Sequence, residues 1–111
     1  MNQGATLGQF EHMVLLTIIR LDGKGHGMAV RRELEAVSGR SVTIGAVYAT
    51  LDRLEAKGLL TSERRAPDAG AGGPVRRLFR AIPAGRQALT DSRALLDRLW
   101  EGVTLSPEKE G

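Results

Sequence analysis

Two short amphipathic segments, 27–38 and 43–57, are separated by only four residues, and this spacing constrains the fold more than any other feature. In each segment apolar residues recur three and four positions apart, which is the period of an α-helix with one buried face. The two apolar stripes consist of Val30, Leu34 and Val37, and of Val47, Leu51 and Leu54. Two helices joined by so short a turn predict a helix-turn-helix.

Three further elements surround this pair. A helix apolar on two sides is expected over about 7–21. Two β-compatible segments, about 59–65 and 75–82, flank an Ala/Gly/Pro/Asp stretch at 66–74, which predicts a hairpin with a long tip. Pro83 suits the first position of a final helix, expected over 83–104.

The final helix carries apolar residues at the 3-4-3-4 spacing that is typical of a helix–helix seam. This seam needs a partner, as does the second apolar face of the helix over 7–21, and a two-fold homodimer would cover both. We expect the dimer interface to contain Phe10, Val14, Leu89, Leu96, Leu99, Trp100 and Val103.

These elements predict a mainly α (α+β) fold in one domain, because 111 residues suffice for a single hydrophobic core. We expect a winged helix-turn-helix over 1–82, built from three helices and a two-stranded β-wing. A C-terminal dimerisation helix over 83–104 and a flexible tail over 105–111 would complete the chain.

Composition leaves little basis for enzymatic chemistry. The chain has no cysteine, and its two histidines, His12 and His26, lack metal-ligand spacing, so we expect neither a catalytic site nor a metal or cofactor. The Gly-rich stretch lacks the Lys-Ser/Thr of a nucleotide-binding loop. The apolar run Met13–Ile19 is too short to cross a bilayer, and it does not resemble a signal peptide. A cytoplasmic location is therefore expected.

The positive charge is concentrated in one segment. The chain carries a net charge of +3, but residues 64–86 contain six arginines and a single acid, Asp68. A basic patch of this kind is typical of a protein that binds a polyanion, although a solvated charged surface would have the same composition. We expect the hairpin arginines to contact DNA phosphates; they are Arg64, Arg65, Arg76 and Arg77.

The outward face of the helix over 43–57 favours the same partner. It presents small or hydrogen-bonding residues, which let a helix backbone approach duplex DNA in the major groove. Tyr48 could reach a phosphate or a base edge, or it could pack against the preceding helix. The candidate DNA-binding residues of this region are Ser41, Thr43, Gly45, Ala46, Tyr48, Ala49, Thr50 and Arg53.

Several stretches together resemble the PadR family of winged-helix regulators, over roughly Leu7 to Val103. The segment Val42–Leu59 is similar to the recognition helix of that family almost position for position. Shorter matches support it: Leu7–Glu11, His26-Gly27, Gly72-Gly73 followed by Arg76-Arg77, and Pro83–Arg86. The sequence departs from the usual pattern at three places: Leu78-Phe79 replaces an aromatic pair, His26 a Tyr, and Ile82 a helix-capping Thr.

The resemblance implies a dimeric repressor that binds an inverted repeat in double-stranded DNA near a promoter. It implies that Tyr48 and the basic wing residues contact DNA, and that a small aromatic effector releases the operator. It also makes Trp100 a candidate to line a pocket for a planar ligand, with a place in the dimer core as the plainer alternative. Winged helices also serve as protein–protein interaction modules without DNA binding, and that alternative stays open here.

Overall fold

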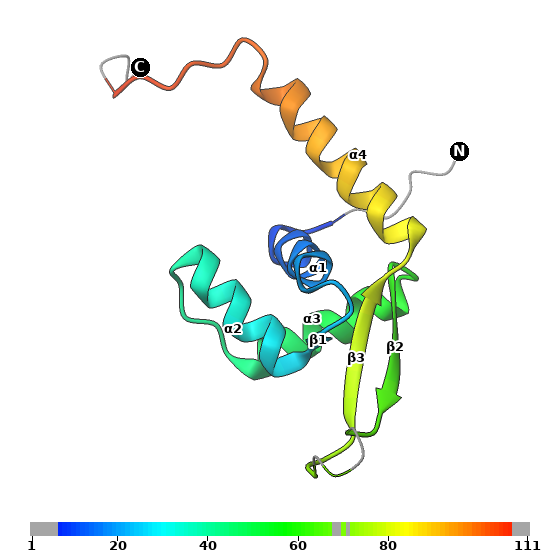
Figure 1. The fold of residues 1–111 in the computed structure, drawn as a ribbon. Coiled ribbons are helices and arrows are strands. Elements are labelled where there is room, and N and C mark those ends of the chain that lie inside the picture. Colours follow the sequence, from blue (N-terminus) through cyan, green and yellow to red (C-terminus); the bar gives the residue numbers. More distant parts are fainter. Residues whose placement is uncertain (1–6, 68–69, 71, 108–111) are drawn as a thin grey trace.

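The computed structural model of the protein describes residues 7–67, 70 and 72–107. Its elements follow one another as helix, short strand, two helices, two strands and a last helix (Figure 1). They are α1 (Gln9–Leu21), β1 (Gly25–His26), α2 (Gly27–Ser38), α3 (Ile44–Ala56), β2 (Leu60–Arg65), β3 (Arg76–Ala81) and α4 (Pro83–Trp100). A winged helix-turn-helix, as expected, is the architecture that this order produces.

The sheet has three strands where two were expected. β3 lies in the middle and pairs antiparallel with β2 on one side and with β1 on the other. β1 contributes only Gly25 and His26, opposite Phe79 and Leu78, and two residues are too few to produce an alternating pattern in the sequence. The consequence is that the start of α2 is fixed to the wing by backbone hydrogen bonds.

The core lies where α1 crosses α2 and α3 and meets the inner face of the sheet (Figure 1). Phe79 of β3 is fully buried among aliphatic side chains from all three helices. The other buried residues of the core are Val14, Leu15, Ile18, Val30, Leu34, Val47, Leu51, Leu54, Leu59, Leu60, Ala88 and Leu89. Val37 was expected on the inner stripe of α2 but is 60% exposed, since the last turn of this helix extends past the core.

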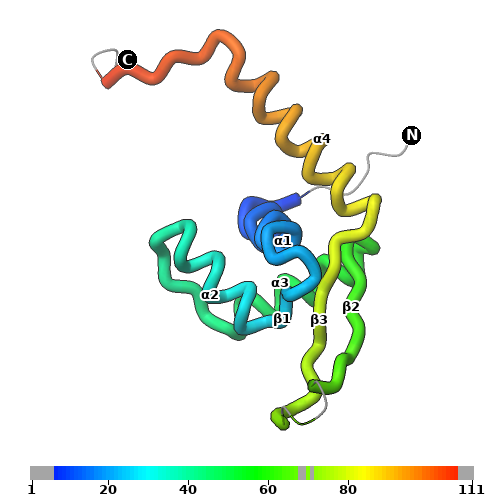
Figure 2. Tube along the Cα trace, viewed as in Figure 1, coloured from blue at the N-terminus to red at the C-terminus, as the bar shows by residue number. Residues whose placement is uncertain are grey.

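α4 begins directly after the wing and extends away from the rest of the fold (Figure 2). Only Ile82 separates β3 from α4; its side chain makes no capping hydrogen bond, and Pro83 opens the helix. Gly85 is required in the first turn, because a Cβ atom there would overlap the backbone carbonyl of Leu59. This close approach fixes the root of α4 against the connection between α3 and β2.

The helix expected over 83–104 ends earlier, at Trp100. Glu101 leaves the helical region of backbone conformation and Gly102 has a φ of 76°, so Val103 does not lie on the helix. Elsewhere the bounds differ from expectation by at most two residues, and those of α2 agree at both ends. The tail expected over 105–111 is described as far as residue 107, and Asp68 of the wing tip lies outside the described residues.

Candidate nucleic-acid interface

The turn before α3 is held by side chains of α2. Glu35 accepts a hydrogen bond from the Val42 amide at 2.8 Å, and Arg31 donates to the Val42 carbonyl at 3.0 Å. Thr43 then caps α3 by accepting a hydrogen bond from the Ala46 amide at 3.1 Å, as its sequence position predicts. Two hydrogen bonds from α2 thus hold the turn, and a third begins α3 directly after it.

Small or hydroxyl-bearing residues make up most of the exposed face of α3 and its preceding turn, with the exposed Asp52 one turn after Tyr48. Most of the candidates named from the sequence lie on it: Ser41, Thr43, Gly45, Ala46, Tyr48 and Ala49. Thr50 does not, and this prediction is wrong: its side chain is 2% exposed and lies on the inward stripe with Val47 and Leu54. The side chains of the six exposed residues are short, Tyr48 excepted, so a partner molecule can approach the α3 backbone closely.

Tyr48 both packs and faces solvent. Its ring lies over Gly27 so closely that a Cβ atom at position 27 would overlap the phenol ring, yet 39% of the residue remains exposed. Glycine at the start of α2 therefore creates the space for the tyrosine. The two uses considered for Tyr48 from the sequence are compatible.

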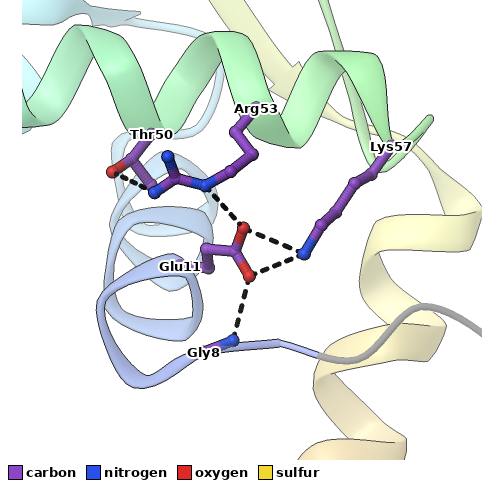
Figure 3. Close-up of polar contacts among 5 residues, drawn as sticks. All are labelled: Gly8, Glu11, Thr50, Arg53 and Lys57. Atoms are coloured by element: carbon purple, nitrogen blue, oxygen red, sulfur yellow. Dashed lines mark hydrogen bonds and ion pairs between the residues drawn. The ribbon is translucent and has the colours of Figure 1, made fainter.

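The Arg53 side chain makes its hydrogen bonds between α3 and the start of α1 (Figure 3). Its Nε donates to Oε2 of Glu11 at 3.1 Å, and one terminal nitrogen donates to Thr50 Oγ1 at 3.2 Å. Lys57 Nζ lies 2.8 and 2.9 Å from the two Glu11 oxygens, and the Gly8 amide donates to the same carboxylate at 2.9 Å. Arg53 thus ties α3 to the start of α1, while 53% of its side chain stays exposed, as expected for a residue on the outward face.

Glu11 is buried, with 8% of its side chain exposed. Burial by itself would raise the pKa of this carboxyl. The hydrogen bonds from Lys57, Gly8 and Arg53 outweigh burial and hold the pKa below its ordinary value. Sequence reasoning gave Glu11 no role; its position three residues after the Gly8 cap of α1 was the available signal.

The wing arginines divide into two groups. Arg64, Arg65 and Arg76 are exposed on the strands, with Arg65 paired to Glu63 at 3.4 Å. Arg77, the fourth arginine expected to contact phosphate, turns back toward α3 and is paired with acidic side chains there. The partners of Arg77 are Glu55 at 2.5 Å, Asp52 and Ser62 each at 3.1 Å, and the Phe79 ring, whose centroid lies 4.8 Å away.

The Arg77 contacts fix the wing relative to α3. Burial would lower the pKa of this guanidinium, but the hydrogen bonds to Glu55 and Asp52 raise it, so its charge is permanent. A planar guanidinium that bridges two carboxylates of one helix from a neighbouring strand holds their relative orientation. Asp52 and Glu55 of α3 thus meet the wing through Arg77.

His26 is a further residue that the sequence did not assign to the site. Its Nδ1 lies 3.4 Å from the Ala29 amide, as an N-cap of α2, and its Nε2 lies 3.0 Å from a terminal nitrogen of Arg76. Burial lowers the pKa of His26, and the charges of Arg76 and Arg32 lower it further. The histidine thus connects the beginning of α2 to the wing.

The residues expected at the dimer interface fall into a buried group and an exposed group. Val14 and Leu89 belong to the core of the single chain, so they leave no surface for a second copy, and Phe10 is half-buried beside them. An apolar surface remains exposed on α4 and just beyond it. This α4 surface consists of Leu95, Leu96, Leu99, Trp100 and Val103.

Two further observations concern the described part of the chain. In residues 7–67, 70 and 72–107, no three or more His, Asp or Glu side chains gather as a metal site would require. None of the described helices has the length and apolar character needed to cross a membrane.

Comparison with known proteins identifies the family. A sequence model described as the transcriptional regulator PadR-like family matches residues 15–91. The chain is 47% identical over 82 residues to transcriptional regulator Rv3488 of Mycobacterium tuberculosis. The aligned segment covers 74% of this chain and 72% of that protein.

Solved structures agree. A PadR family transcriptional regulator from Eggerthella lenta superposes with a TM-score of 0.65 at 25% identity, over 81% of this chain and 76% of that one. A PadR-like transcription factor from Bacteroides fragilis shares the fold with a TM-score of 0.71 at 23% identity, over 85% of each chain. The proteins that this chain matches are regulators and not enzymes, and the chain belongs to the PadR-like family of transcriptional regulators.

Proposed function

We propose that the protein binds duplex DNA as a homodimer and represses transcription by occupying an inverted repeat at a promoter. α3 enters the major groove with the face formed by Ser41, Thr43, Gly45, Ala46, Tyr48 and Ala49. The wing follows the adjacent backbone with Arg64, Arg65 and Arg76. The observation that carries the proposal is the exposed face of small and hydroxyl-bearing residues on α3, with exposed arginines on the wing beside it.

The winged helix over 1–82 reads DNA in this proposal, and the helix from Pro83 onward joins two copies through the α4 surface. A bacterial regulator of this kind acts in the cytoplasm, where the chromosome lies. An aromatic effector that binds beside Trp100, which is 54% exposed in the single chain, would release the operator by changing how the two copies pack.

A fluorescence-anisotropy titration tests DNA binding. The labelled duplexes are the promoter upstream of the protein's own gene and a random sequence of equal length, each measured from 50 to 200 mM salt. Three phosphate-contacting arginines in each subunit predict a salt slope of about −5, so affinity should fall about 10³-fold over this range. Binding should favour the promoter.

Variants separate base reading from backbone contact. Tyr48→Ala should reduce the preference for the promoter, with an affinity loss of about tenfold or more. Arg64→Gln should weaken both duplexes equally and make the salt slope shallower by about two per dimer. Arg98→Gln, near the far end of α4, removes the same charge and should change neither quantity. Absence of binding to either duplex at 50 mM salt would overturn the proposal in favour of a protein–protein interaction module.

A further inference from the structure

A pocket of about 520 Å³ lies between the wing and the segment that leads into α2. Lys24, His26, Arg65 and Arg76 contribute its polar wall, and Leu78 lies among its apolar lining. The described lining residues include no Asp or Glu, so three cationic residues and a histidine line one space. Such a wall is chemically suited to an anion.

The strand register concentrates this charge. Arg65 of β2 lies directly opposite Arg76 of β3, so the two side chains project from the same face of the hairpin. Like charges in directly opposite positions destabilise a β-ladder, and Glu63 offsets only part of this repulsion through its 3.4 Å contact with Arg65. An anion between the two arginines would remove the remaining repulsion.

The hydrogen bonds of His26 also favour an anion. A neutral imidazole has one acceptor nitrogen, but both ring nitrogens of His26 face donors, the Ala29 amide at 3.4 Å and Arg76 at 3.0 Å. A bound anion resolves this conflict: Nδ1 accepts from Ala29, while Nε2–H and Arg76 both donate to the anion. The positive end of the α2 dipole adds to the same field.

We propose that this pocket binds a phosphate group through Lys24, His26, Arg65 and Arg76. A tetrahedral dianion presents several oxygens in different directions, which suits donors that converge from a turn, a helix start and two strands. The phosphate belongs either to the DNA backbone, in which case the inference rests on the proposed function, or to a small phosphate-bearing molecule that binds the protein on its own.

Imidazole NMR of the whole protein provides the test, since the chain contains only two histidines and His12 serves as an internal control. Sulfate is the probe, because it is a tetrahedral dianion that does not titrate between pH 5 and 8, and chloride at equal ionic strength is the reference. The groups around His26 are Lys24, Arg32, Arg65 and Arg76, all cationic, with Glu63 behind Arg65. Because Nδ1 keeps its hydrogen bond from Ala29, sulfate should fix the Nε2–H tautomer of His26, which changes the chemical shifts of its two ring nitrogens.

Arg76→Gln should abolish the response of His26 to sulfate, whereas Arg64→Gln should preserve it. Arg64 is the matched control because it neighbours the same hairpin pair but does not line the pocket. Circular dichroism of both variants checks that each is folded. An unchanged His26 signal, or equal changes at His12 and His26, would overturn the proposal.

A parallel titration with the promoter duplex, whose binding is measured independently by anisotropy, distinguishes the two sources of phosphate. A change of the His26 signal on duplex binding that is lost in Arg76→Gln assigns the pocket to the DNA backbone. A response to sulfate but not to bound duplex assigns it to a small phosphate-bearing molecule. If the duplex binds but neither the duplex nor sulfate changes the His26 signal, the phosphate pocket is refuted and the proposed function stands. If the duplex does not bind, the proposed function is refuted, and the sulfate titration alone decides whether the pocket binds an anion.

Discussion

Glu11 connects two helices that are distant in the sequence, because its carboxylate at the start of α1 holds Arg53 and Lys57 of the α3 region (Figure 3). Replacement by Gln keeps the shape but removes the charge. We expect Glu11→Gln to lower the free energy of unfolding at pH 7 by about 1–3 kcal/mol, as measured by urea denaturation. The two cations are partly exposed, so water replaces some of the lost interaction.

The pH dependence distinguishes this charge effect from a packing effect. The pKa of Glu11 is lower in the folded protein than in the unfolded chain, so its stabilisation is complete above the unfolded pKa and is lost as pH falls through the folded pKa. The stability difference between the parent protein and Glu11→Gln should therefore disappear under acid conditions. A difference that persists unchanged at pH 3 would contradict this assignment.

Sequence patterns predicted which residues are exposed on α3 better than they predicted what long side chains contact. Thr43 capped its helix as expected, since a cap depends on residues three positions away. The ion pairs of Arg53 and Arg77 were not predicted, because their partners lie far along the chain: Glu11 is 42 residues from Arg53, and Glu55 is 22 from Arg77. Helical periodicity carries no information about such pairs.

Between elements, the contact of Arg77 with Glu55 and Asp52 couples the wing to α3. If Arg77 positions the wing and does not touch phosphate, Arg77→Gln should weaken DNA binding about tenfold while leaving the salt slope unchanged. Anisotropy over a series of salt concentrations measures both quantities. Arg64→Gln is the comparison, since its slope should become shallower; an equal change of slope in Arg77→Gln would make Arg77 a phosphate contact after all.

The order of the elements was predictable because each helix and both long strands carry their own period and end signals. β1 was not predictable, since its two residues are defined only by pairing with β3. The end of α4 was overestimated because the apolar spacing continues to Val103, whereas the backbone leaves the helix at Glu101. A side-chain pattern does not record where the hydrogen bonds of a helix stop.

The whole molecule measures 63 × 37 × 21 Å, and α4 projects from it with apolar side chains in solvent. Leu96 and Leu99 are 50% and 64% exposed, an arrangement that a second copy would cover. We expect the parent protein to have about twice the chain mass of 11.9 kDa by light scattering. The double variant Leu96→Asp, Leu99→Asp should be a folded monomer, because buried carboxylates would oppose the association.

Val37→Asp is the control for the α4 double variant, since it introduces the same group at an apolar residue that is equally exposed on α2. This variant should remain dimeric. A dimer that survives the α4 substitutions, or one that Val37→Asp dissociates, would place the interface elsewhere on the molecule.

The single residue between β3 and α4 has a mechanical consequence. Ile82 is the whole connection between β3 and α4, and Gly85 in the first turn of α4 lies directly against Leu59. The first turn of α4 therefore cannot move independently of the wing, and we expect the wing and α4 to move as one rigid unit. In a two-fold dimer that associates through α4, the angle at which the two α4 helices cross would then set the distance between the two winged-helix domains. The length of the DNA spacer between half-sites would be encoded at the end of the molecule farthest from the DNA.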